Sequence, residues 1–127
     1  MDKTQLYRYT GNAGQLYGAR RVQIAEGRAA GAQVIEVKTG GGLTFDILPD
    51  TGLDIGALCY KGVNISYLSK NGMDARCAFL PYETEFIHTF PGGMLYTCGL
   101  RSVGPANCDN GEWHPLHGRY HGLPASE

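Results

Sequence analysis

The sequence predicts an all-β protein built from short antiparallel strands, and three observations support this prediction. Its 127 residues include 19 glycines, which fall between short β-like runs and suit a chain with many tight turns. The run LTFDIL places Leu43, Phe45 and Ile47 two residues apart, which is the spacing of one face of a strand. No stretch repeats its apolar residues at a helical period. We therefore expect an antiparallel β-sandwich.

Five strands are expected in the first half of the chain, each bounded by glycine or other turn-forming residues. They span residues 19–26, 31–38, 43–48, 54–60 and 63–68. In the third strand, Thr44 and Asp46 should face away from the apolar side, so this strand is half-buried. Lys61-Gly62 joins the last two strands and predicts a hairpin. Residues 7–18 predict a loop or a weakly paired first strand.

The second half of the chain has weaker periodicity. Residues 77–90 mix aromatic and acidic side chains, and a short helical turn over residues 82–86 is one option. No repeat or linker divides the chain, so we expect a single β domain over residues 1–127. Such a sheet must close or leave unpaired edges, and the chain stops just after its richest loop. The residues alone leave open whether a second half is missing, and a homodimer through open sheet edges is one way to cover them.

The composition excludes two classes of partner. Eleven basic and twelve acidic residues give a net charge of -1, which predicts no field that would gather nucleic acid or an anionic membrane.

The first residues lack the apolar core of a secretory signal, and no run is long enough to span a bilayer. Four cysteines without a CxxC pair predict reduced thiols. We expect a cytoplasmic protein.

The segment from Gly92 to Arg119 holds the densest set of functional side chains, including the only tryptophan and two of the four histidines. His117 is the first candidate, because an imidazole can donate or accept a proton near pH 7. The alternative is a loop histidine whose nitrogens are satisfied by backbone or water. Gly118 would permit close approach of a ligand, and Arg119 would offer donors to hydroxyls or carboxylates, unless it is a surface arginine.

His114, His117 and His121 form an HxxHxxxH pattern, which would place three ligands on one face of a helix. Pro115 and Gly118 oppose a helix at this point, so we expect neither a metal nor another cofactor.

Four further residues of this segment have two interpretations each. Cys98 is a nucleophile or a small buried thiol. Arg101 and Asp109 line the same pocket as His117 or are solvated loop charges. Trp113, beside His114, stacks on the apolar face of a sugar or closes the core. We take His117, Arg119, Arg101, His114 and Trp113 as the candidate binding residues.

The run GGMLYTCGLRSVG, followed by PLHGR, resembles the aldose 1-epimerase (galactose mutarotase-like) superfamily, and most closely its uncharacterised mutarotase-related branch. Leu116-His117-Gly118-Arg119 stands where the family has its His-Gly motif. The resemblance extends over about residues 20–125, and its most distinctive parts are TCGL and PLHGR.

The resemblance implies a β-supersandwich, of which this chain would be the N-terminal portion, and a reaction that interconverts the α and β anomers of a free sugar. A carboxylate base takes the proton from the anomeric hydroxyl, and a histidine acid protonates the ring oxygen. His117 matches the family's first histidine, and Arg119 would bind hydroxyls by its position. The catalytic role would then belong to His117.

The sequence departs from this family pattern in two ways. Thr51 stands where the branch usually carries an arginine. The family's second histidine and catalytic glutamate lie beyond the His-Gly motif, and this chain ends ten residues after His117. The base is therefore unassigned, and its candidates are Glu83, Glu85, Asp109, Glu112 or a second subunit. The alternative function is a non-catalytic sugar-binding or interaction module, and the identity and phosphorylation of the sugar stay open.

Overall fold

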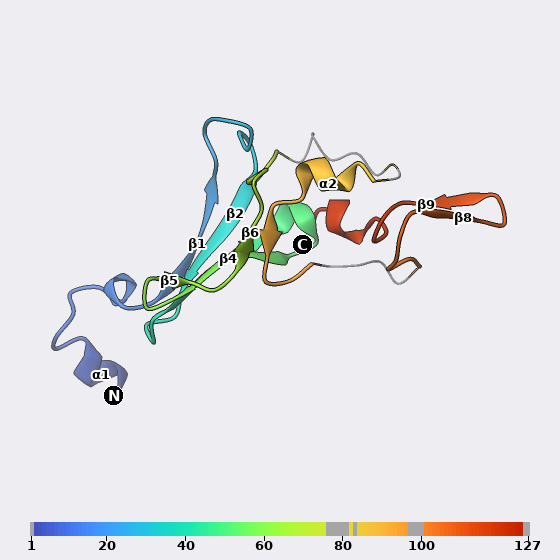
Figure 1. Ribbon diagram of the computed structural model, residues 1–127. Coiled ribbons are helices and arrows are strands. Elements are labelled where there is room, and N and C mark those ends of the chain that lie inside the picture. Colours follow the sequence, from blue (N-terminus) through green and yellow to red (C-terminus); the bar gives the residue numbers. More distant parts are fainter. Residues whose placement is uncertain (1, 76–81, 83, 97–100, 126–127) are drawn as a thin grey trace.

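The computed structural model describes residues 2–75, 82, 84–96 and 101–125. Its main element is a five-stranded antiparallel sheet whose strands follow one another in chain order (Figure 1). The strands are β1 (Gly18–Gln23), β2 (Gln33–Lys38), β3 (Leu43–Leu48), β4 (Asp54–Tyr60) and β5 (Val63–Asn64). The prediction of an all-β antiparallel fold is confirmed.

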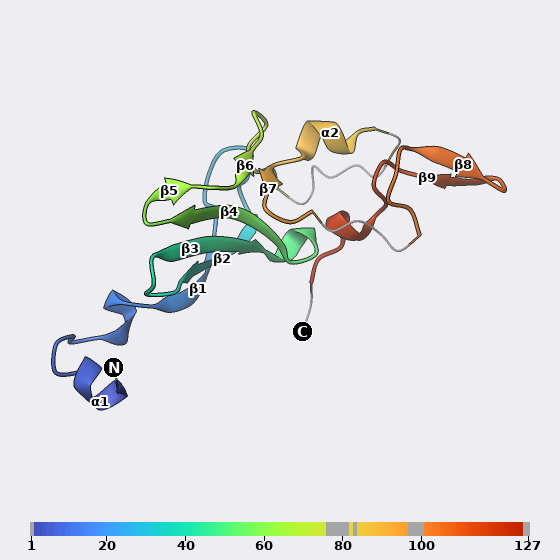
Figure 2. The same ribbon diagram turned by 60° about the horizontal axis from the view of Figure 1, so that its bottom comes forward.

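Smaller elements extend the structure from both ends of this sheet (Figures 1 and 2). Two two-stranded sheets pair β6 (Tyr67–Leu68) with β7 (Gly92–Gly93) and β8 (Asn107–Asp109) with β9 (Glu112–His114). The helices are α1 (Lys3–Leu6) and α2 (Phe86–Thr89), with 3-10 turns η1 (Ala13–Gln15), η2 (Pro49–Thr51) and η4 (Tyr120–Gly122). Figures 1 and 2 show the β8–β9 hairpin projecting away from the five-stranded sheet. The described residues contain no helix long and apolar enough to cross a membrane.

The predicted strands occur within a few residues of their expected positions. The third strand has the predicted bounds, and β4 and β5 form the predicted hairpin. Its turn residues Lys61 and Gly62 have positive φ angles of 49° and 83°, as in the two-residue turns that match strand twist. Residues 7–17 form a loop that contains η1, so the loop alternative for this lead-in is confirmed and α1 precedes it. The helical turn expected over residues 82–86 begins only at Phe86.

The expected strand over residues 63–68 is interrupted, and a side-chain turn explains the interruption. Ser66 accepts a hydrogen bond from the backbone N–H of Leu58 (3.1 Å) and donates one to Asn64 Oδ1 (2.8 Å). The amide of Asn64 donates in turn to the carbonyl of Ser66 (2.7 Å). These bonds interrupt the expected strand between β5, which pairs with β4, and β6, which pairs with β7, because short polar side chains compete for backbone groups.

The register gives the sheet two chemically different faces, because residues directly opposite each other point to the same side. Glu36 pairs with Asp46, and Lys38 pairs with Thr44, on one face. Phe45 pairs with Val37 and with Leu58 on the other face. The predicted orientation of Thr44 and Asp46, away from the apolar side, is therefore confirmed.

Few apolar side chains of the described residues are fully buried. Ala32, Val34 and Leu48 are only 3–4 % exposed and lie at the end of the sheet next to η2. Gly56 permits this packing, since a Cβ atom there would lie 3.2 Å from Leu48 Cδ1. Next to this core, η2 contacts η4, and the carbonyl of Leu123, directly after η4, accepts a hydrogen bond from the Gly52 N–H.

Candidate functional site

Two of the predicted histidines lie together in a cluster of aromatic rings, which we call the histidine cluster and define by Phe86, Phe90, Tyr96, His117 and His121. The His117 ring packs edge-on against Phe86 and Tyr96, with centroid distances of 5.3 and 5.7 Å. The His121 ring lies 4.9 Å from Tyr96 and 5.8 Å from Phe86. The cluster joins α2, the segment after β7 and the turn that carries the His-Gly motif.

His117 is held in a backbone conformation that residues other than glycine rarely adopt, with a φ of 61°. Its N–H donates to the Gly104 carbonyl (2.9 Å), and the neighbouring Gly118 N–H donates to Pro115 (3.0 Å). Such conformations concentrate at functional sites, where the surrounding structure maintains them.

The ring of His117 has a defined tautomer. Nδ1 lies 3.1 Å from the carbonyl oxygen of Val103, and a carbonyl oxygen can only accept a hydrogen bond. Nδ1 therefore carries a hydrogen, and in the neutral ring Nε2 carries the lone pair. This arrangement orients the imidazole and leaves Nε2 as the atom that can take up and return a proton.

His121 has a different environment, because it is only 5 % exposed within η4. Burial, and to a lesser extent the charge of His117, lowers the pKa of His121 to about 4. His121 is consequently neutral near pH 7 and packs as an aromatic ring.

A small cavity of about 50 Å³ adjoins His121 and Tyr96. Three carboxylates also line it, from Asp50, Asp54 and Asp74. Asp50 accepts a hydrogen bond from the backbone N–H of Gln33 (2.8 Å). Ligand pockets usually measure roughly 300 Å³ or more, so this cavity is too small for a sugar.

Asp74 is held by a two-pronged ion pair with Arg28, at 2.8 and 2.6 Å. We expect Arg28→Met to lower the free energy of unfolding by about 1–2 kcal/mol, because the Asp74 side chain is only 6 % exposed and would lose charged partners. Arg20→Met is the control, since the Arg20–Glu36 pair is exposed and should be worth roughly 0.5 kcal/mol or less. Urea unfolding of both variants checks this, and equal losses would contradict it.

The other predicted binding residues lie on or near the β8–β9 hairpin or at the surface. Arg101 forms an ion pair with Glu112 on β9 (2.5 Å), and the Trp113 side chain is 62 % exposed. His114 ends β9, and Arg119 is exposed beside the cluster. The structure therefore brings His117 and His121 together, while the hairpin that carries Trp113 projects away from the sheet (Figure 1).

The carboxylates expected as candidates for the catalytic base also lie apart from one another. Glu112 is paired with Arg101, Asp109 is exposed on β8, and Glu85 precedes α2. Glu83 lies outside the described residues, as does Cys98. Thr51, which stands where the related branch has an arginine, donates to the Leu48 carbonyl (3.3 Å) and lines the small cavity.

No group of three or more His, Cys, Asp or Glu side chains within the described ranges is placed to hold a metal ion. His114 ends a strand, whereas His121 lies in η4, so the HxxHxxxH spacing does not form a helical face. Cys59 and Cys108 are free thiols in the described part of the chain.

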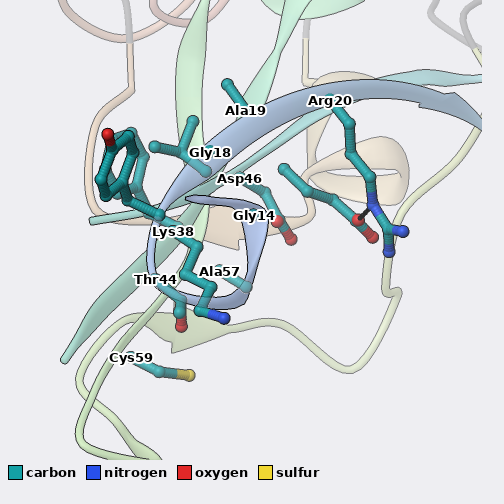
Figure 3. Close-up of a pocket in the computed structure, with 13 residues that line it drawn as sticks. Gly14, Gly18, Ala19, Arg20, Lys38, Thr44, Asp46, Ala57 and Cys59 are labelled. Carbon is teal, nitrogen blue, oxygen red and sulfur yellow. Dashed lines mark hydrogen bonds and ion pairs between the residues drawn. The ribbon is translucent and has the colours of Figure 1, made fainter. Parts of the chain in front are cut away.

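The polar face of the sheet carries a larger hollow of about 660 Å³ (Figure 3). Arg20 and Glu36 form an ion pair (2.6 Å) there, and Lys38 Nζ donates to the Gln15 carbonyl (2.7 Å). Burial, and secondly the charge of Glu36, raises the pKa of Asp46 above its ordinary value. The lining of this open hollow shares no residue with the histidine cluster, so within the described residues the hollow and the small cavity are separate.

Comparison with known proteins gives one family and one related structure. The family described as a domain of unknown function (DUF4432) matches residues 29–127. A crystal structure from Klebsiella pneumoniae subsp. pneumoniae MGH 78578, described as a "putative aldose 1-epimerase", aligns with a TM-score of 0.74 and 18% sequence identity. The alignment covers 90% of this chain and 32% of that chain, so this chain spans about a third of its length. No curated protein matches in sequence. The predicted mutarotase-like fold is thereby confirmed.

Proposed function

We propose, from the premise that this chain belongs to the family described as a domain of unknown function (DUF4432), that it binds a small sugar and carries the histidine side of a mutarotase-like site. The fold shared with the Klebsiella structure supports a site of this class. The observation that carries the proposal is the orientation of the His117 ring. Its Nδ1 is hydrogen-bonded to the Val103 carbonyl oxygen, which leaves Nε2 as the nitrogen that can transfer a proton. Arg119, exposed two residues further on, would bind sugar hydroxyls.

The reaction needs one proton donor and one proton acceptor. Protonated His117 gives its Nε2 hydrogen to the ring oxygen while a base removes the hydrogen of the anomeric hydroxyl. The bond between the anomeric carbon and the ring oxygen breaks, its electron pair stays on that oxygen, and a carbonyl forms. Rotation of the open chain, followed by the reverse transfers, closes the ring as the other anomer and restores both groups.

The alternative function is a sugar-binding module without catalysis, and the state of the nearby carboxylates favours it. Asp74 is paired with Arg28, Asp50 accepts a backbone hydrogen bond, and Asp54 is buried. A base that meets a sugar hydroxyl must be accessible to it, and these three groups are already engaged or enclosed. A complete catalytic site would take its base from elsewhere.

The test is anomer exchange, measured by NMR magnetisation transfer with a panel of free aldoses and hexose phosphates. A complete site predicts exchange above the buffer rate, and His117→Asn should then lower the catalysed rate by about 100-fold or more, since proton transfer contributes about that factor. Asparagine tolerates the positive φ of residue 117 better than alanine does, which limits structural damage. His88→Asn, on an exposed face of α2, is the matched control and should exchange normally.

The outcomes separate the two functions. Exchange that depends on His117 supports the enzyme. Sugar-induced chemical shifts without exchange support the binding module, and the absence of both in a folded protein overturns the proposal.

A further inference from the structure

The dipeptide Asn-Gly occurs twice in the chain, at Asn71-Gly72 and at Asn110-Gly111. Asparagine is a chemically labile residue, and it is most labile before glycine. Glycine has no side chain to hinder attack of its backbone nitrogen on the amide carbon of the preceding asparagine. The two copies share this chemistry, so a difference in their reactivity must come from the structure around them.

Asn71-Gly72 is held by two hydrogen bonds, one on each group that would have to react. The side-chain amide of Asn71 donates to the Ile87 carbonyl oxygen (2.6 Å). The Gly72 N–H donates to the Ser69 carbonyl oxygen (3.3 Å). Both bonds must break before the Gly72 nitrogen reaches the amide carbon of Asn71, so the structure protects this copy.

Asn110-Gly111 lacks both restraints. Among the described residues, none accepts a hydrogen bond from the Asn110 amide or from the Gly111 N–H. Both residues are exposed and form the two-residue turn between β8 and β9, with φ angles of 50° and 81°. The hairpin has short strands and projects from the molecule, so it opens locally at little cost (Figures 1 and 2).

We propose that Asn110 is a modification site, at which the chain deamidates itself through a cyclic imide. The Gly111 nitrogen forms a bond to Cγ of Asn110, the bond from Cγ to Nδ2 breaks, and ammonia leaves with the hydrogen from the Gly111 nitrogen. Water then opens the imide at one of its two carbonyl carbons. Opening at Cγ gives aspartate, and opening at the backbone carbonyl gives isoaspartate. The reaction needs only water, and it does not depend on sugar binding.

Either product changes the hairpin that carries Trp113. A carboxylate at position 110 lies between Asp109 and Glu112, and like charges this close repel each other. Isoaspartate also lengthens the backbone by one carbon within a two-residue turn, which then no longer matches the twist of its strands. The modification therefore weakens the β8–β9 pairing that positions Trp113.

The test follows both asparagines in the 127-residue chain, kept at about pH 7.5 and about 37 °C and then digested at acidic pH. Mass spectrometry with fragmentation locates each change from amide to acid and distinguishes isoaspartate from aspartate. We expect Asn110 to deamidate about tenfold or more faster than Asn71, because two hydrogen bonds restrain the Asn71 copy. The product at Asn110 should contain isoaspartate, which direct hydrolysis of the amide does not give.

The chain unfolded in guanidinium is the matched control, because it keeps both Asn-Gly dipeptides and removes the structure. There the two asparagines should react at similar rates. Asn110→Gly retains a turn of the same type and should abolish the product at position 110.

Three results would overturn the proposal. The first is a folded chain in which Asn110 reacts no faster than Asn71 or stays unmodified. The second is a product at Asn110 without isoaspartate. The third is a tenfold difference that persists in guanidinium, because neighbouring residues and not the fold would then cause it.

Discussion

Gly92→Ala is expected to lower the free energy of unfolding by about 3 kcal/mol or more. Gly92 pairs with Leu68 in the β6–β7 sheet at a φ of 89°, which alanine adopts only with strain. A Cβ atom there would collide with the Tyr67 carbonyl oxygen and lie 3.0 Å from the Ser69 nitrogen. Both obstacles are backbone atoms, so no side chain can move aside.

Guanidinium unfolding, followed by circular dichroism, measures this loss. Gly18→Ala is the control, because the strand conformation and open space at Gly18 accept a methyl group. It should be neutral or stabilise slightly, since alanine restricts the unfolded chain. Similar losses in the two variants would show that the backbone contacts around Gly92 are not as described.

Acidification from about pH 7 to about pH 4 is expected to remove roughly 3 kcal/mol of stability through His121 alone. Burial lowers the pKa of His121 to about 4, whereas the same side chain titrates near 6.5 when unfolded. Between these values the unfolded chain binds more protons than the folded one. The stability that neutral His121 contributes to the folded state is therefore fully present above about pH 6.5 and is lost as the pH falls toward 4.

Urea unfolding at a series of pH values tests this, with His121→Phe as the informative variant. Phenylalanine keeps a ring against Tyr96 but cannot be protonated, so the loss between pH 6.5 and 4 should become about 3 kcal/mol smaller. His88→Gln, at an exposed position on α2, should keep the wild-type pH profile. An unchanged profile in His121→Phe would mean that His121 is not buried in its neutral form.

The strands were predictable because each depends on residues close together in the sequence. Alternation of Leu43, Phe45 and Ile47 fixes the faces of β3, and Lys61-Gly62 supplies the turn of the next hairpin. The break between β5 and β6 was not predicted, because it depends on the side-chain hydrogen bond between Ser66 and Asn64. Strand propensity alone does not indicate such a bond.

The candidate site was less predictable, because its contacts join distant segments. His117 was identified from its motif, but its packing on Phe86 is a contact across 31 positions that no spacing indicates. The carboxylate of Asp74 reaches the small cavity through its ion pair with Arg28, 46 residues away. Trp113 and Arg101 are near His117 in sequence, yet a hairpin carries Trp113 outward and Arg101 pairs with Glu112.

The most direct test of the account is a ¹⁵N NMR spectrum of the histidine side chains, recorded with and without a panel of sugars. The structure predicts that neutral His117 carries its hydrogen on Nδ1, because that atom faces the Val103 carbonyl. The proposed function predicts that a bound sugar shifts the Nε2 signal of His117. The opposite tautomer, or an Nε2 signal that no sugar moves, would contradict the assignment of His117 as the proton-transferring residue.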